Sequence, residues 1–160
     1  MTNDKWRLSC SLPISPVGPV SAIGFNTMEN RKPRVVIIED DEYSREAIEH
    51  LLKAEGCETR SAIGGVSGYC AARRFRPDVI VLDLNLPDID GERVLRKLRG
   101  NRVLGRVPII VITGYSRDEI PEGVSSSAEF VITKPASFDD VIWAIFDLLR
   151  RDAALNVISW

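Results

Sequence analysis

The sequence predicts an α/β fold in which helices cover both faces of a five-stranded parallel sheet. Short, uniformly apolar runs recur along the chain, and such runs suit strands that are buried on both faces. Segments with helical apolar spacing separate these runs, so that strand and helix alternate five times. Parallel strands joined in this way need right-handed crossovers, which place helices on both sides of the sheet.

The first strand is expected over residues 34–39, where an apolar run ends in Glu39, Asp40 and Asp41. The period then becomes helical, and Gly56 supplies the stop of this first helix. Its expected apolar stripe consists of Tyr43, Ala47, Ile48, Leu51 and Leu52.

Residues 57–62 predict a weaker second strand, and residues 64–75 predict a second helix of modest quality. Residues 78–83 are a third strand that ends on Asp83, at the edge of the sheet where parallel α/β folds place their ligands. The loop signature Asn85-Leu86-Pro87-Asp88 and Gly91 follow this strand.

The second half of the chain repeats the alternation. Residues 92–99 form a third helix with Val94, Leu95 and Leu98 facing inward, and residues 107–113 form a fourth strand. Residues 115–127 show little apolar periodicity, so any fourth helix is expected to be short or irregular. Residues 129–133 form a fifth strand, and the stripe of the last helix consists of Phe138, Val141, Ile142, Ile145, Leu148 and Leu149.

Composition limits the function classes. The 160 residues suit one domain, and their formal charge of -2 gives no footprint for nucleic acid or an anionic membrane. No run reaches the roughly 18 apolar residues of a membrane span. The three cysteines match neither a disulfide framework nor a zinc pattern, so a reducing, cytoplasmic location is expected. Residues 1–33 are expected to be a flexible extension, residues 34–151 the folded domain and residues 152–160 a tail.

Polar side chains follow four of the five expected strands. In a doubly wound sheet Glu39, Asp40, Asp83, Thr113 and Lys134 would share one edge. Three converging carboxylates need a cation among them, and oxygen ligands suit Mg²⁺. A lysine and a hydroxyl add a countercharge and a hydrogen-bond donor for a phosphoryl group. The set predicts phosphoryl transfer onto Asp83.

Four motifs carry a family resemblance. The stretches IIEDDEYSR, VLDLNLPDIDG, VITG and ITKP occur in this order, and together they resemble the receiver domain of two-component response regulators over about residues 34–150. The resemblance implies a flavodoxin-like sheet with strand order 2-1-3-4-5. It also implies a cis bond between Lys134 and Pro135.

The resemblance also implies roles for the residues at the sheet edge. Glu39 and Asp40 take the metal-binding acidic positions, and Asp83 takes the position of the phosphoacceptor, which also binds the metal. Asn85 takes the position whose backbone carbonyl reaches the Mg²⁺. Thr113 takes the position of the switch hydroxyl, and Lys134 that of the lysine beside the phosphoryl group.

Two positions depart from the receiver pattern. Receivers often carry an aromatic residue three positions before the lysine, where this chain has Val131, and its aromatic is Phe130. Strand side chains alternate, so these two should point to opposite faces. The poor fourth helix is the second departure. Residues 108–115 (PIIVITGY) are similar to a stretch found in a subgroup of stand-alone receivers.

The leading hypothesis is a single-domain response regulator that is not an enzyme beyond its own phosphorylation and autodephosphorylation. A histidine kinase or a histidine phosphotransfer protein would phosphorylate Asp83. Output would be protein binding, with homodimers possible, through the face of strand four, the irregular region, strand five and the last helix.

Three alternatives remain open at this stage. An Asp-nucleophile phosphohydrolase would use the same aspartate, although its usual second aspartate is replaced here by Asn85. A phosphorylation-independent binding module of receiver type is the other functional alternative. The run Glu39-Asp40-Asp41 could also serve only to start a helix, because acidic residues cap helix amino termini.

Overall fold

The computed structural model describes residues 31–157. The expected flexible extension therefore lies outside the described residues up to position 30, and so does the end of the expected tail, residues 158–160. The folded elements within residues 31–157 follow the alternation of strand and helix that the apolar runs predict.

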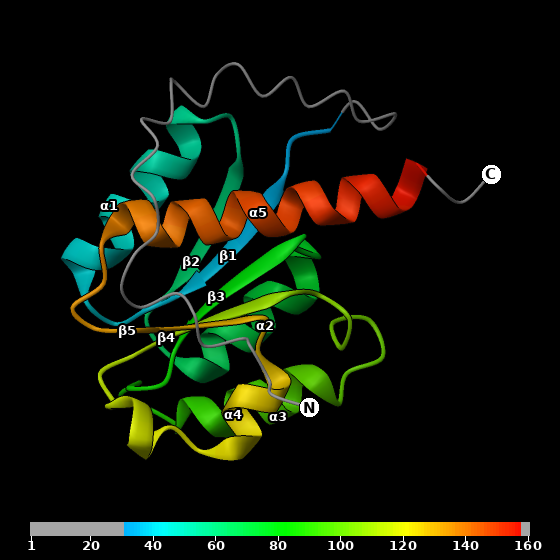
Figure 1. Ribbon diagram of the computed structural model, residues 1–160. Coiled ribbons are helices and arrows are strands. Elements are labelled where there is room, and N and C mark those ends of the chain that lie inside the picture. Colours follow the sequence, from blue (N-terminus) through cyan, green and yellow to red (C-terminus); the bar gives the residue numbers. More distant parts are fainter. Residues whose placement is uncertain (1–30, 158–160) are drawn as a thin grey trace. The chain divides into compact units, whose positions relative to one another are not determined.

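Five strands form one parallel sheet in the order β2-β1-β3-β4-β5, which confirms the predicted topology (Figure 1). The strand bounds are β1 Arg34–Ile38, β2 Glu58–Ala62, β3 Val79–Asp83, β4 Ile109–Thr113 and β5 Phe130–Thr133. β4 begins two residues later than predicted, after Pro108, which has no N–H to contribute to the sheet.

Helices cover both faces of the sheet. α1 and α5 pack together on one face, whereas α2, α3 and α4 cover the other (Figure 1). The helix bounds are α1 Glu42–Ala54, α2 Gly65–Phe75, α3 Gly91–Arg99, α4 Glu122–Ser127 and α5 Phe138–Val157.

The core lies on both sides of the interior strands β1, β3 and β4. All residues of β3 and β4 are buried, as their continuous apolar runs predict. The predicted inward residues of α3, namely Val94, Leu95 and Leu98, are also buried. Asp83 pairs with Ile112, and Thr113 pairs with Thr133, so that the strands end together at one edge of the sheet.

One predicted core residue is wrong. Tyr43 was placed in the apolar stripe of α1, but its side chain is 74% exposed. The buried stripe of the helix is carried by Ile48 and Leu52, which are four residues apart, and position 43 in the first turn lies off this line. The Tyr43 ring instead contacts Phe138 at the start of α5, with ring centroids 5.9 Å apart.

The region after β4 is as irregular as predicted. A single 3-10 turn, η3 (Arg117–Glu119), and the six-residue α4 replace a full helix. In contrast, α5 continues through Val157, into the segment expected to be a tail. Among the described helices, α5 included, none is long and apolar enough to cross a membrane.

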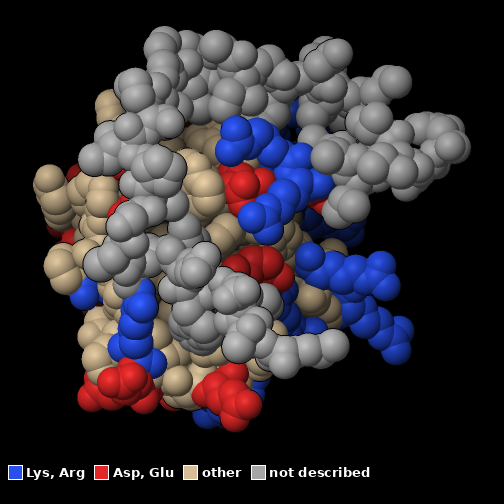
Figure 2. All heavy atoms as spheres, viewed as in Figure 1, with Lys and Arg blue, Asp and Glu red and all other residues tan. Residues whose placement is uncertain are grey.

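Charges are distributed unevenly between the two ends of the sheet. Glu39, Asp40 and Asp41 follow the end of β1, whereas basic residues occupy the last turns of α2 and α3. Figure 2 shows Lys and Arg side chains projecting on the right, where the loop between α3 and β4 lies in Figure 1. Carboxylates are therefore concentrated at the carboxyl end of the sheet, and Lys and Arg side chains at the ends of α2 and α3.

Gly91 allows the loop after Asp83 to fold back on itself. A Cβ atom at this position would lie 2.4 Å from Leu84 Cα and 2.6 Å from the carbonyl oxygen of Asp83. Both are backbone atoms, which cannot rotate away as a side chain could. Only glycine therefore permits this close approach of α3 to the end of β3.

We predict that Gly91→Ala destabilises the protein by about 2 kcal/mol or more, because the new methyl group must displace the backbone beside Asp83. Gly123→Ala is the matched control. This glycine lies in α4, and a Cβ there would meet no atom within 4 Å. Urea unfolding should show unchanged or higher stability for the control. Equal stability of the two variants would contradict the tight approach.

Candidate functional site

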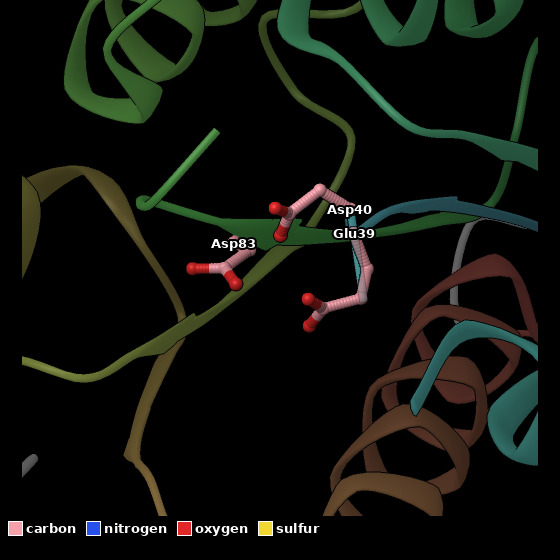
Figure 3. A group of neighbouring side chains, drawn as sticks. All are labelled: Glu39, Asp40 and Asp83. Atoms are coloured by element: carbon pink, nitrogen blue, oxygen red, sulfur yellow. The ribbon is translucent and has the colours of Figure 1, made fainter. Parts of the chain in front are cut away.

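The carboxyl ends of three strands bring four charged side chains together. Glu39 and Asp40 follow β1, Asp83 ends β3, and Lys134 follows β5. Carboxylate oxygens of Glu39, Asp40 and Asp83 all lie within 4.8 Å of one another (Figure 3). Glu39 and Asp83 are buried, whereas Asp40 is exposed. The cluster therefore concentrates negative charge and is exposed to solvent on the side of Asp40.

Lys134 is the cation of this cluster. Its Nζ donates to Asp83 Oδ2 at 2.5 Å and to both carboxylate oxygens of Glu39 at 3.1 and 3.2 Å. The bond to Pro135 is cis, as predicted. One ammonium group thus joins two buried carboxylates that come from different strands.

The second oxygen of Asp83 is held by its own loop. Asp83 Oδ1 accepts the backbone N–H of Asn85 at 2.8 Å, so Lys134 and Asn85 hold one oxygen each. This arrangement fixes the orientation of the carboxylate at the end of a buried strand. The predicted position of the Asn85 carbonyl toward a metal remains an expectation.

Thr113 lies at the end of the neighbouring strand β4 and is completely buried. Its hydroxyl oxygen accepts the backbone N–H of Tyr115 at 3.1 Å. The hydroxyl is therefore bonded to the first turn of the irregular region. The positions of the hydroxyl and of that loop are therefore linked by this hydrogen bond.

The acidic run after β1 serves both purposes that the sequence left open. Asp41 caps α1, because its side chain accepts the N–H of Ser44 at 2.8 Å. Glu39 instead faces the charged cluster, where Oε1 also accepts the N–H of Asp41 at 3.2 Å. Helix capping and the charged site thus use different members of one short run.

The electrostatics of the site show a shortage of positive charge. Burial, followed by the charge and hydrogen bonding of Asp83, raises the pKa of Glu39 to about 7, although Lys134 opposes this rise. Burial alone would lower the pKa of Lys134, but its hydrogen bond and attraction to Asp83, with help from Glu39, raise it above its ordinary value.

This donor set fits a hard divalent cation. The three carboxylates of the cluster are compensated only in part by one ammonium group, so a further cation would stabilise their ionised forms. Oxygen ligands with one open side are typical of Mg²⁺ sites, which retain water molecules. Glu39, Asp40 and Asp83 are therefore the residues that could hold Mg²⁺.

Asp88, part of the loop signature after β3, has a role that the sequence pattern does not predict. Its carboxylate accepts the N–H groups of Gly65 at 2.7 Å and Val66 at 3.0 Å, at the start of α2. These bonds, with Val66 the stronger influence, lower the pKa of Asp88. The clue in the sequence was the glycine pair before α2, because Asp88 fills the space that a Cβ at Gly64 would need.

Phe130 and Val131 point to opposite faces of β5, as the alternation of strand side chains predicts. Val131 packs against the core on the side of α2, α3 and α4. Phe130 meets Trp143 of α5 edge-on, with ring centroids 6.0 Å apart, and Arg151 lies over the Phe130 ring. Val131 holds the position of the usual aromatic residue, and Phe130 lies on the opposite face of the strand. Phe130 therefore does not take the place of that aromatic.

The chain matches known proteins in a consistent way. A family model described as the response regulator receiver domain matches residues 35–146. RpaA of a Synechocystis species, a DNA-binding dual master transcriptional regulator, is 33% identical over 121 residues, which cover 74% of this chain and 50% of that protein. The cell cycle response regulator CtrA of Brucella ovis is 36% identical, with coverage of 74% and 50%. The chain spans about half the length of the curated relatives it matches.

Solved structures agree with these relatives. The signal receiver domain of a putative LuxO repressor protein from Vibrio parahaemolyticus has a TM-score of 0.72 and 25% identity, covering 81% of this chain and 99% of its own. The receiver domain of Francisella response regulator 1452 has a TM-score of 0.69 and 28% identity, covering 76% and 99%. Each of these receiver domains is matched over nearly its whole length.

We predict that Glu39→Gln makes the stability of the metal-free protein less dependent on pH. The folded protein holds the Glu39 proton up to about pH 7, whereas the unfolded chain releases it near 4.5, so this group stabilises the fold below 4.5 and loses that effect as pH rises through 7. As the pH rises from about 5 to about 8, the free energy of unfolding of the variant should increase by on the order of 1 to 3 kcal/mol relative to that of wild type.

Chemical denaturation in EDTA at about pH 5 and at about pH 8 measures this change. Glu46→Gln, which alters an exposed carboxylate of α1, is the matched control and should show the same difference from wild type at both values. If the free energies of unfolding of Glu39→Gln and wild type differed by the same amount at both pH values, the raised pKa of Glu39 would be contradicted.

Proposed function

The chain belongs to the response regulator receiver domain family of two-component systems, and from this premise we propose that Asp83 accepts a phosphoryl group. The donor is a phosphohistidine of a sensor histidine kinase or of a histidine phosphotransfer protein. The observation that carries the proposal is the Asp83 carboxylate itself. Asp83 ends a buried strand, and its Oδ2 accepts a hydrogen bond from Lys134 Nζ at 2.5 Å. Carboxylate oxygens of Asp83, Glu39 and Asp40 lie within 4.8 Å of one another, close enough to bind one metal ion.

In the proposed transfer, the P–N bond to the donor histidine breaks as a bond forms between phosphorus and a carboxylate oxygen of Asp83. Asn85 keeps Oδ1 in place through its backbone N–H. Lys134, now bound to Oδ2, provides a positive charge that can follow the new phosphoryl oxygens. Positioning and charge compensation are the main contributions of the protein.

A Mg²⁺ ion bound by Glu39, Asp40, Asp83 and the backbone carbonyl of Asn85 would neutralise charge on the transferred group. The observed excess of carboxylates supports this assignment, since Lys134 alone leaves the pKa of Glu39 raised to about 7. We infer that metal binding keeps Glu39 ionised at neutral pH.

Thr113 is proposed as the switch hydroxyl. If its side chain turns toward the phosphoryl group, its present bond to the Tyr115 N–H must change. Tyr115 begins the loop that leads to η3 and α4, the least regular part of the domain. Phosphorylation would then shift the populations of this loop and of the face formed by β4, α4, β5 and α5.

We propose that this face binds a downstream protein and can also mediate a homodimer. The chemistry proposed for the described residues is the phosphorylation and dephosphorylation of Asp83. The curated relatives are longer than this chain, and one of them is named as DNA-binding. Protein binding as the output is therefore our proposal for this chain and is not taken from these relatives.

Incubation with Mg²⁺ and acetyl phosphate should add one phosphoryl group to the protein, and Asp83→Asn should remove this adduct completely, because an amide cannot form the acyl phosphate. Intact-mass analysis measures both results, and EDTA should suppress the adduct in wild type. A phosphoryl group that persists in the variant would place the acceptor elsewhere.

Asp40→Asn should weaken Mg²⁺ binding by about tenfold or more, since it removes an anionic ligand from the exposed side of the cluster. Asp41→Asn is the matched control, because asparagine also caps helices and Asp41 points to Ser44 rather than into the cluster. Isothermal titration calorimetry with MgCl₂ measures both affinities. An equal loss in the two variants would argue against a specific role for Asp40.

A further inference from the structure

A basic region lies at the edge of the sheet where the strands begin, opposite the phosphorylation site. It combines the last turns of α2 and α3 with the loop that leads into β4. Its exposed residues, which we call the basic rim, are Arg73, Arg74, Arg76, Lys97, Arg102 and Arg106. The right-hand side of Figure 2 shows Lys and Arg side chains projecting at this end of the molecule.

The cations of the basic rim have no acidic partners among residues 31–157. Acidic groups at this end of the sheet have other partners among the described residues. Glu58 pairs with Arg34, Asp78 accepts the backbone N–H of Arg34 at 2.8 Å, and Glu129 pairs with Arg99 at 2.8 Å. The rim therefore presents uncompensated positive charge on a protein whose net charge is -2.

Helix electrostatics explain only part of this concentration. Cations in the last turn of a helix interact favourably with its dipole, and this accounts for Arg73 and Arg74 in α2 and for Lys97 in α3. Arg102 and Arg106 lie in the loop beyond the C-cap of α3, outside its last turn. They form no side-chain hydrogen bond or ion pair within the described residues, so no such contact explains their charge.

The rim is organised in advance of any binding. Asn101 donates from Nδ2 to the Tyr69 hydroxyl at 3.0 Å, and its Oδ1 accepts the N–H groups of Val103 and Leu104. Lys97 and Arg73 lie over the Tyr69 ring, 5.0 and 5.9 Å from its centroid. A surface that is already ordered loses less entropy when a partner binds.

We propose that the basic rim is a docking surface for an acidic segment of a partner protein. Five of its six cations are arginines, whose planar guanidinium groups pair with carboxylates through two parallel hydrogen bonds. Val103, 58% exposed, lies beside Arg102 and offers an apolar contact within the charged surface. Such a mixture of arginine and apolar side chains is typical of protein interfaces.

Two observations favour a protein over a nucleic acid. Single-stranded nucleic acids stack their bases on open aromatic rings, but cations already lie over the two rings nearest the rim, Tyr69 and Phe75. The acidic total charge also opposes the long-range attraction of a polyanion such as duplex DNA.

The rim should act independently of phosphorylation. A five-residue strand separates the two ends of the sheet by roughly 15 Å. No hydrogen bond or ion pair of the described residues joins a rim side chain to Glu39, Asp83 or Lys134. The rim is therefore a second binding surface, separate from the phosphorylation site.

Fluorescence anisotropy with a labelled polyglutamate peptide of about 20 residues at low ionic strength, where screening is weak, tests the proposal. Arg102→Gln/Arg106→Gln in the full chain should weaken binding by about tenfold, because two rim cations are lost. Arg117→Gln/Arg150→Gln is the matched control. It removes the same charge from two exposed arginines outside the rim and should leave the affinity within about twofold of wild type.

Three results would overturn the proposal. These are no detectable binding of the peptide, an equal loss of affinity in both double variants, and a higher affinity for duplex DNA or phosphatidylserine vesicles that depends on the same rim arginines. Asp83→Asn should bind the peptide as wild type does. The docking proposal can therefore fail or succeed separately from the phosphorylation proposal.

Discussion

The structure of the site depends on one electrostatic constraint, which is the sharing of a single ammonium group by two buried carboxylates. Lys134 reaches Asp83 and Glu39 from β5, although these residues belong to β3 and β1. Burying either carboxylate without a partner would be strongly unfavourable. The strand order that builds the apolar core therefore also brings the countercharge to the acidic cluster. A change in strand pairing would leave both carboxylates uncompensated.

The surroundings of Asp83 divide into a firmly held half and a loosely held half. On one side, Gly91 packs against the backbone of Leu84, and Asp88 ties the same loop to the start of α2. On the other side, the loop after Thr113 leads only to a single 3-10 turn and a six-residue helix. A site that must hold an acceptor and also transmit a change needs both properties.

Sequence patterns predicted the elements that apolar periodicity controls. The five strands are confirmed, because burial on two faces leaves a clear signal in runs such as residues 79–82. The short α4 is confirmed because residues 115–127 lack apolar periodicity, whereas the confirmed sheet order was implied by the family resemblance. Tyr43 was misplaced because the first turn of a helix gives too few residues to fix the phase of its stripe. The alternation of strands and helices was enough to place the polar residues at the strand ends. It did not predict which hydrogen bonds and ion pairs these residues form.

What the sequence could not supply was the partner of each polar group. The run Glu39-Asp40-Asp41 fitted both a helix cap and a metal cluster, and only geometry separates Asp41 from the other two. Asp88 was overlooked for the same reason. Its partners are backbone N–H groups more than twenty residues earlier in the chain, and the Gly64-Gly65 pair at the start of α2 is only an indirect sign of them.

The two faces of β5 limit how a change at Thr113 can spread through the domain. Val131 packs into the core beside α2, α3 and α4, and the nearest aromatic on the strand, Phe130, lies against Trp143 on the opposite face. No aromatic ring of β5 can therefore fill space vacated by the Thr113 side chain. The direct link from this hydroxyl is its bond to the Tyr115 N–H. Under the proposed chemistry, a rotation of Thr113 would be transmitted first to the backbone of the β4–α4 loop and only then to side chains on the output face.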